Sequence, residues 1–299
     1  MTLDQLRIFV AVAEHEHMTR AARQLHLTQS ATSAAIAALE NRYATKLFNR
    51  VGRRIELTDA GRLFVVEARA VLARAAAAET VLADLAGLKR GALALAASQT
   101  VANYWLPPLI HRFQTLYPAI TVDLRIGNTE QVAAWLLEGT VNFGVVEGEI
   151  DDGRLSVTPV ADDQLVLVVG ASHPWAGLAT IAPAQLSDTP WVLRERGSGT
   201  RAILETTLAT FGLALSDLTV ALELPSNEAV RAAVSAGAGA TVISRLVVEA
   251  SLSSGALTAL DFPLPRRRFV MVRHKERYVT QAERELQNLL TGPGRHAAG

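Results

Sequence analysis

Short polar side chains gather over residues 28–33, at the beginning of a segment with helical periodicity. Hydroxyl and amide groups at the start of a helix reach base edges and phosphates when the helix enters the major groove of DNA, and a glutamine can bind adenine with two hydrogen bonds. The alternative is an ordinary helix N-terminal cap with a solvated face, and the segment alone favours neither. The residues with this chemistry are Thr28, Gln29, Ser30, Thr32 and Ser33.

Three arginines follow at Arg50, Arg53 and Arg54. They surround Gly52, and the alternation of apolar and polar residues at 55–58 predicts a small hairpin with a basic tip. Beside a recognition helix, such a wing suits phosphate or minor-groove contact. An isolated arginine cluster, by contrast, is more often only a solvated surface.

A third group of polar residues lies where predicted strands lead into predicted helices in the longer, C-terminal part of the chain. Hydroxyls and backbone amides at such connections can receive an anion, glycines let amides approach a ligand, and arginines add fixed charge. The alternative is a capped connecting loop. The candidate residues are Ser98, Gln99, Thr100, Thr129, Arg194, Glu195, Ser198, Gly199, Thr200 and Arg201.

Two acidic residues near these connections have three open interpretations. Glu147 and Glu228 can recognise an ammonium group, orient an arginine, or be solvated loop acids, and the last is the usual state of an acid. Both are kept as candidate ligand-binding residues.

The N-terminal candidates need helices that hold them rigidly. Thr2 and Gln5 form a capping-box pattern for a first helix that ends near 15–17, a second helix is expected after Thr19, and a third after a tight break at residues 26–27. Residues 1–58 are therefore predicted to form a winged helix-turn-helix. A long helix is expected over residues 59–88, and its near-heptad apolar positions are typical of pairing with a second copy.

After residue 91 the periodicity changes to strands separated by helical segments. This pattern predicts an α/β fold with a parallel sheet in each of two lobes. Lobe I is expected at about 91–161 and 266–290 and lobe II at about 162–265, within a domain over 89–299. Ligands of open α/β sheets bind at the carboxyl ends of the strands, so a cleft is expected between the lobes.

Composition narrows the possible functions. The chain of 299 residues has no cysteine, which excludes disulfides and thiolate metal sites or nucleophiles. Its net charge is zero, yet residues 1–58 hold eight basic against five acidic residues. Seven histidines are scattered, no catalytic constellation is found, and no metal site or cofactor is expected. Neither an export signal nor a membrane span is evident, so a cytoplasmic location is expected.

The N-terminal residues resemble the LysR-type DNA-binding domain, in order and in spacing. His17, Met18 and Thr32 depart from the family's usual residues. These differences would affect base preference or local packing, and not the fold. The matching motifs are Leu6-Arg7-Ile8-Phe9, Thr19-Arg20-Ala21-Ala22, Thr28-Gln29-Ser30-Ala31-Thr32-Ser33, Leu39-Glu40, Leu47-Phe48-Asn49-Arg50 and Leu57-Thr58-Asp59-Ala60-Gly61.

The resemblance extends over nearly the whole chain and implies a function. It implies a transcriptional regulator that binds double-stranded operator DNA, pairs through the linker helix into a dimer or tetramer, contacts RNA polymerase, and takes a small effector in a periplasmic-binding-protein-like domain. The branch resembles regulators of sulfur or carbon assimilation, which favours an anionic effector. Substituting Arg201 should then abolish the response to the effector while basal DNA binding remains. The alternative is a solute-binding or sensor module whose N-terminal domain makes protein contacts.

Overall fold

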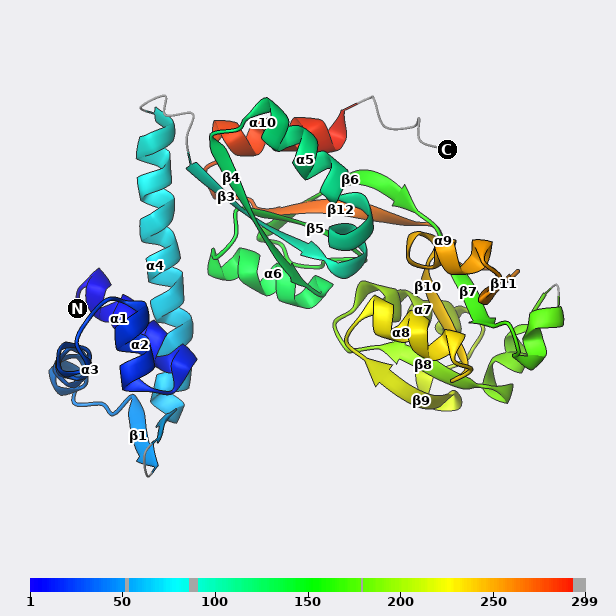
Figure 1. Ribbon diagram of the computed structural model, residues 1–299, viewed down its shortest axis with the longest axis horizontal. Helices are drawn as coiled ribbons and strands as arrows, with labels where there is room; N and C mark the ends of the chain where they lie inside the picture. Colours follow the sequence, from blue (N-terminus) through cyan, green and yellow to red (C-terminus); the bar gives the residue numbers. More distant parts are fainter. Residues whose placement is uncertain (52–53, 86–90, 179, 293–299) are drawn as a thin grey trace. The chain divides into compact units, whose positions relative to one another are not determined.

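Two compact units make up the chain. The computed structural model describes residues 1–51, 54–85, 91–178 and 180–292. One unit comprises residues 1–88 with the short segment 138–140, and the other comprises residues 89–137 with 141–299 (Figure 1).

Three short helices form the core of the first unit: α1 (Leu3–His15), α2 (Met18–Gln24) and α3 (Gln29–Tyr43). The expected capping box of Thr2 and Gln5 is present at α1. Thr28 caps α3 by accepting a hydrogen bond from the backbone N–H of Ala31 at 3.2 Å. The second helix begins one residue before Thr19, so His17 and not Thr19 is its N-cap residue.

The predicted wing and linker helix complete this unit. Strands β1 (Phe48–Val51) and β2 (Arg54–Leu57) pair antiparallel, and α4 (Asp59–Leu85) follows. Phe9 of α1 packs between the other two elements, because its ring centroid lies 5.4 Å from that of Phe48 and 4.9 Å from that of Phe64. Large apolar side chains remain exposed along α4 within this chain, among them Leu63, Leu82 and Leu85.

Two five-stranded sheets form the second unit, and each belongs to one lobe. The sheet of lobe I has the order β4-β3-β5-β12-β6, and that of lobe II has the order β11-β7-β10-β8-β9. The strands of lobe I are β3 (Gly91–Ser98), β4 (Ile120–Gly127), β5 (Phe143–Glu147), β6 (Leu155–Asp163) and β12 (Arg267–His274). Those of lobe II are β7 (Leu165–Gly170), β8 (Pro190–Arg194), β9 (Thr219–Leu224), β10 (Ala240–Ser244) and β11 (Leu257–Leu260).

Helices cover both faces of each sheet. In lobe I, α5 and α10 lie along one face and α6 along the other (Figure 1). In lobe II, successive residues of β7 alternate between two apolar clusters, one beneath α7 and one beneath α8 and α9. The helices are α5 (Pro107–Leu116), α6 (Thr129–Glu138), α7 (Gly199–Thr210), α8 (Asn227–Ser235), α9 (Arg245–Ser253) and α10 (Gln281–Thr291), with short helical turns η1 (Val101–Trp105), η2 (Pro174–Gly177), η3 (Pro183–Asp188) and η4 (Leu215–Asp217).

Both sheets are mixed, which corrects the prediction of a parallel sheet. In lobe I, β12 runs antiparallel to β5 and β6, and in lobe II, β7 runs antiparallel to β10 and β11. The cause is the chain path, because the chain leaves lobe I on β6 and returns to it on β12 in the opposite direction.

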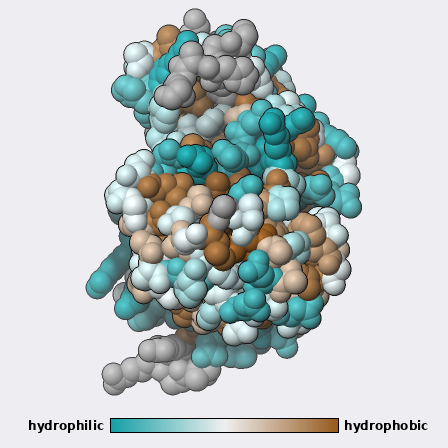
Figure 2. Space-filling model, turned by 90° about the vertical axis from the view of Figure 1, so that its right-hand side faces the viewer, coloured by the Kyte–Doolittle hydropathy of each residue, from teal (hydrophilic) through white to brown (hydrophobic). Residues whose placement is uncertain are grey.

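The face of the molecule in Figure 2 mixes hydrophobic and hydrophilic side chains, as is usual for a solvated surface.

One buried acid in α10 makes the stability of the second unit depend on pH. Glu283 is 2% exposed and accepts a hydrogen bond from Gln287 at 3.3 Å. Burial raises the pKa of Glu283 to about 7, although a hydrogen bond from the backbone N–H of Thr280 to its carboxylate and the charges of nearby arginines oppose the rise.

The variant Glu283→Gln should therefore be more stable than the natural chain at pH 8, by about 1–3 kcal/mol, and nearly equal to it at pH 4.5. A carboxyl with a raised pKa favours the folded state below its unfolded pKa, and this contribution is lost as the pH rises through about 7. Melting curves across this range test the prediction. A constant difference between the two proteins would contradict it.

Candidate functional site

The polar start of α3 is the candidate DNA-binding face. Thr28, Gln29 and Ser30 are exposed and Ser33 is half-buried, so all four side chains reach solvent. Thr32 is fully buried and its hydroxyl donates to the carbonyl of Thr28 at 3.1 Å. The prediction that Thr32 contacts DNA is therefore corrected, because this side chain faces the core of the unit.

The wing is held in place by a buried carboxylate at the end of α3. Glu40 accepts hydrogen bonds from the backbone N–H of Leu47 at 2.9 Å and of Phe48 at 3.2 Å, and from Lys46 at 2.7 Å. Burial would raise the pKa of Glu40, but these hydrogen bonds outweigh it and lower the pKa below its ordinary value. Arg50 and Arg54 belong to the two wing strands, and Arg53 lies outside the described residues.

In the second unit, groups from the two lobes bind each other directly at the carboxyl ends of β3, β8 and β9. Gln99 donates to the carbonyl of Pro225 at 2.6 Å and accepts from the backbone N–H of Asn227 at 3.0 Å. Asn227 also donates to the hydroxyl of Thr100 at 3.0 Å and accepts from the guanidinium of Arg194. The predicted residues of both lobes thus meet in one hydrogen-bonded layer.

Glu147 lies at the centre of this layer. Glu147 is 2% exposed, and its carboxylate accepts hydrogen bonds from the hydroxyls of Ser98 and Thr100. The Thr129 hydroxyl donates to the backbone carbonyl of Glu147 at 2.6 Å. Ser98 and Thr100 were predicted to receive an anion, and the structure places an internal carboxylate on them.

The second-lobe loop contributes Arg194 and Glu195. They form a two-pronged ion pair with distances of 2.7 and 2.9 Å, and Asn128 of lobe I donates to Glu195 at 3.3 Å. Burial would raise the pKa of Glu195, but the hydrogen bond and charge of Arg194 lower it overall. This pair therefore forms part of the contact between the lobes.

Arg201 is placed differently from its neighbours in the loop. Its guanidinium binds Glu205 at 2.9 Å and Glu223 at 2.5 Å, and it donates to the carbonyl of Arg194 at 3.2 Å. All three partners belong to lobe II. Because its substitution removes these contacts, a test of the Arg201 prediction needs a melting curve of the variant beside the effector assay.

Glu228 also connects the lobes. It accepts hydrogen bonds from Asn103 at 3.2 Å and Tyr104 at 3.1 Å in η1, and from Ser226 at 3.0 Å in its own lobe. Burial would raise the pKa of Glu228, but its hydrogen bonds lower it overall. The acid thus has three neutral donors and is more than a solvated loop residue.

Sequence reasoning missed the two residues that join the lobes at their crossing strands. Asp163 ends β6 and Arg267 begins β12, and they form a buried ion pair of 2.5 Å. Arg267 also donates to Thr200 at 2.9 Å, and Ser244 donates to Asp163 at 2.7 Å. Burial raises the pKa of Asp163 and the charge of Glu147 adds to the rise, against the opposing charge of Arg267. The sequence did carry a signal for this pair, because charged residues lie beside both predicted crossings of the chain between the lobes.

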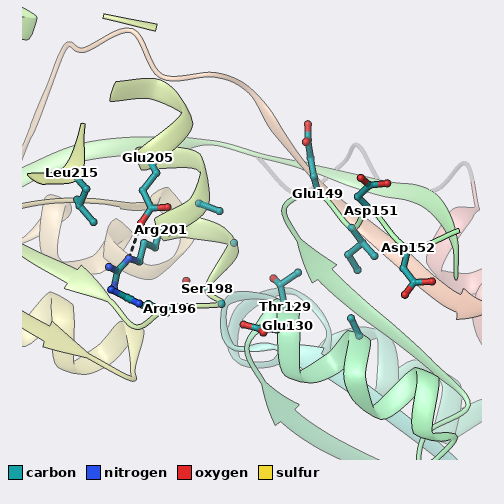
Figure 3. Close-up of a pocket in the computed structure, with 15 residues that line it drawn as sticks. Thr129, Glu130, Glu149, Asp151, Asp152, Arg196, Ser198, Arg201, Glu205 and Leu215 are labelled. Atoms are coloured by element: carbon teal, nitrogen blue, oxygen red, sulfur yellow. Dashed lines mark hydrogen bonds and ion pairs between the residues drawn. The ribbon is translucent and has the colours of Figure 1, made fainter. Parts of the chain in front are cut away.

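A cavity of about 660 Å³ opens beside this layer, between α6 and α7. Figure 3 shows Ser198 and Thr129 close together, with Arg201 and Glu205 on one side and Glu149, Asp151 and Asp152 on the other. Acidic side chains outnumber the two arginines in the wall. The cavity is therefore less suited to a highly charged anion than the loop sequence suggested.

Two family models match the chain. Residues 3–62 match the "Bacterial regulatory helix-turn-helix protein, lysR family", and residues 86–292 match the "LysR substrate binding domain". The chain belongs to the LysR family of transcriptional regulators. The predicted winged helix-turn-helix, linker helix and two-lobed α/β domain are confirmed by this match and by the solved structures below.

Similar proteins cover nearly the whole of this LysR regulator. It is 36% identical to the HTH-type regulator YeiE of Escherichia coli K12, over 95% of each chain. It is 34% identical to the RuBisCO operon regulator of Allochromatium vinosum, over 93% of this chain and 91% of that one. It is 31% identical to CysL of Bacillus subtilis strain 168, over 97% and 99% of the two chains.

Two solved structures share the fold. The LysR family regulator CbnR superposes with a TM-score of 0.73 at 23% identity, over 97% of this chain and 98% of that one. The regulatory domain of Synechocystis PCC6803 CcmR in complex with 2-PG superposes with a TM-score of 0.64 at 27% identity, over 70% and 100% of the two chains.

In the described residues, no helix has the length and apolarity needed to cross a membrane. The same part of the chain has no group of three or more histidines and acids placed to hold a metal ion.

Proposed function

We propose that this LysR regulator binds operator DNA through the start of α3 and the wing, and that a small anionic effector between its lobes controls the response. The observation that carries the proposal is the polar layer in which Gln99, Thr100 and Asn227 join the lobes. A ligand entering there must exchange contacts between lobes for contacts with itself. Because CcmR has been solved with 2-PG, an anion is the favoured class of effector.

The mechanism follows from unequal binding. An effector shifts the balance between two lobe arrangements only if it binds one of them more tightly. The exposed apolar residues of α4 support pairing with a second chain, and we propose that dimers or tetramers convert the lobe movement into a changed spacing of the DNA-binding units. The protein would then act by binding, in the cytoplasm, with RNA polymerase as a further partner, and would not catalyse a reaction.

A mobility-shift assay on the DNA upstream of the protein's own gene tests this proposal. We expect specific binding in the presence of nonspecific competitor DNA, weakened by salt and altered by an anionic metabolite. If the protein binds no DNA under any condition, the alternative of a sensor module whose N-terminal unit contacts proteins replaces the proposal.

The wing should contribute affinity and not sequence preference. The double variant Arg53→Ala, Arg54→Ala is expected to weaken binding to all DNA sequences and to reduce the slope of log K against log salt by about one per lost phosphate contact. Gln29→Ala should instead weaken binding to the operator selectively, since a glutamine amide can form two hydrogen bonds with adenine. Salt titrations on operator and random DNA separate these effects. Loss of binding to one operator alone in the arginine variant would contradict phosphate contact.

A further inference from the structure

Two hydrogen-bond donors are buried without a partner where lobe II begins α7. Among the described residues, the hydroxyl of Ser198 and the Nη2 group of Arg267 have no hydrogen-bond partner, and the two residues are only 4% and 5% exposed. Ser198 is the N-cap residue of α7, yet its side chain accepts no hydrogen bond from the helix. The backbone N–H groups of the first helical turn have no intrahelical acceptor either. This place is therefore rich in donors, and a buried donor without an acceptor is unfavourable.

A buried acceptor with spare capacity lies beside these donors. The carboxylate of Glu147 receives two hydroxyl hydrogen bonds, from Ser98 and Thr100, whereas a carboxylate can accept about four. No ion pair in the described part of the chain includes Glu147. A buried carboxylate with only two neutral donors is under-satisfied, and a further donor would stabilise it.

Sheet register and direct contacts place the donors and the acceptor in the same part of the second unit. Glu147 is directly opposite Phe269 on β12, and Arg267 lies two residues from Phe269, so both side chains are on the same face of the lobe I sheet. Arg267 binds Thr200, which is two residues from Ser198. Between them, Gly199 lies against the carbonyl of Glu147 so closely that a Cβ atom would collide with it.

We propose that the effector is a small ligand that carries an oxyanion and, on the same or an adjacent atom, a hydrogen-bond donor. The oxyanion accepts from Ser198, from Arg267 and from the first turn of α7, and the donor group binds the carboxylate of Glu147. The inference rests on the proposed function, because it assigns the chemistry of the same cleft. An oxyanion without a donor leaves Glu147 facing a second negative charge in a buried site.

The charges around the site agree with a ligand of low net charge. Arg267 is already paired with Asp163, and Arg194 with Glu195, so neither guanidinium is a free counter-ion for a polyanion. In the wall of the neighbouring cavity, acidic side chains such as Glu149 and Asp151 outnumber the arginines (Figure 3). Protonated oxyanions, hydroxy acids and amino acids all satisfy the donor requirement, whereas fully deprotonated oxyanions do not.

Calorimetric titration of the full chain with matched probes tests the inference. Glycolate and glycine are compared with acetate, and inorganic phosphate at pH 7 is compared with sulfate, because the members of each set differ in whether they carry a donor. We expect the donor-bearing probes to bind at least about tenfold more tightly. Comparison of glycolate with glycine shows whether the site prefers a hydroxyl or an ammonium donor.

Two variants and one control locate the effect. Glu147→Gln presents an amide that can itself donate a hydrogen bond. Acetate and sulfate should therefore bind more tightly to this variant, and the preference for donor-bearing probes should be lost. Glu149→Gln removes an equal charge from an exposed neighbour two residues away and should keep the preference. Ser198→Ala should weaken all probes about threefold to tenfold without changing their order.

Equal binding of the matched probes, a preference that survives in Glu147→Gln, or no binding of any probe would each overturn the inference. The proposed function has a separate test. If another small molecule alters the mobility shift on operator DNA, effector control stands although the donor requirement fails. If no molecule alters it, effector control itself fails.

Discussion

Replacing Glu40 by alanine should destabilise the DNA-binding unit by about 2–4 kcal/mol and abolish operator binding at temperatures that the natural chain tolerates. The variant removes the acceptor of two backbone N–H groups, those of Leu47 and Phe48, and leaves them buried and unpaired. These residues begin the wing, so its position relative to α3 is lost with them. Scanning calorimetry and the mobility shift measure the two effects.

Lys46→Ala is the matched control for Glu40. The Lys46 side chain is 73% exposed, so its ion pair with Glu40 should contribute less than about 1 kcal/mol. The effect of Glu40→Ala should also shrink in acid. Because the pKa of Glu40 is lowered in the folded protein, its contribution is present above the unfolded pKa and is lost as the pH falls through the folded one. Equal losses in both variants would show that the ion pair matters and the backbone hydrogen bonds do not.

Asp163→Ala should destabilise the effector-binding unit by about 3–5 kcal/mol, because it leaves the guanidinium of Arg267 buried without a counter-ion. The double variant Asp163→Leu, Arg267→Met should recover much of this loss, since an apolar pair of similar size has no charge to desolvate. Thermal or urea unfolding of the full chain gives both values. Additive losses in the double variant would mean that the two side chains stabilise the unit independently.

The same two strands supply a control for the buried pair. Asp162 and Arg268 occupy the next register position and lie 3.7 Å apart, but both side chains are exposed. Asp162→Ala should therefore cost less than about 1 kcal/mol. A large loss there would show that the backbone of the crossing, and not burial of the ion pair, sets the effect.

Local sequence patterns were sufficient where local chemistry decides the structure. Thr2 with Gln5 and Thr28 with Ala31 are contacts within one helical turn, so the helix starts could be predicted from neighbouring residues. The strand β6 could not be predicted from local pattern, because Pro159 and its polar neighbours are not typical of a strand. It lies at the edge of its sheet, where proline is tolerated. The helix α9, by contrast, carries a local signal, because Ser244 is a normal N-cap residue for it.

The places of the candidate effector-site residues in the fold could be predicted from the sequence, but their contacts with one another could not. Ser98, Thr100, Ser198 and the other loop residues lie near the carboxyl ends of strands, as the rule for open α/β sheets requires. Which of them bind each other depends on how two distant lobes meet, and periodicity carries no information about that. Arg267 begins β12, and its partner Asp163 is 104 residues away in the sequence.

That separation determines the order in which the domain can form during synthesis. β12 lies between β5 and β6 in the lobe I sheet, but it leaves the ribosome only after the whole of lobe II. Lobe II is an uninterrupted insertion and can fold as it emerges. The sheet of lobe I, by contrast, stays incomplete until β12 has been synthesised. A nascent chain released before residue 267 would therefore expose the edges of β5 and β6, and these edges are where we expect truncated chains to aggregate.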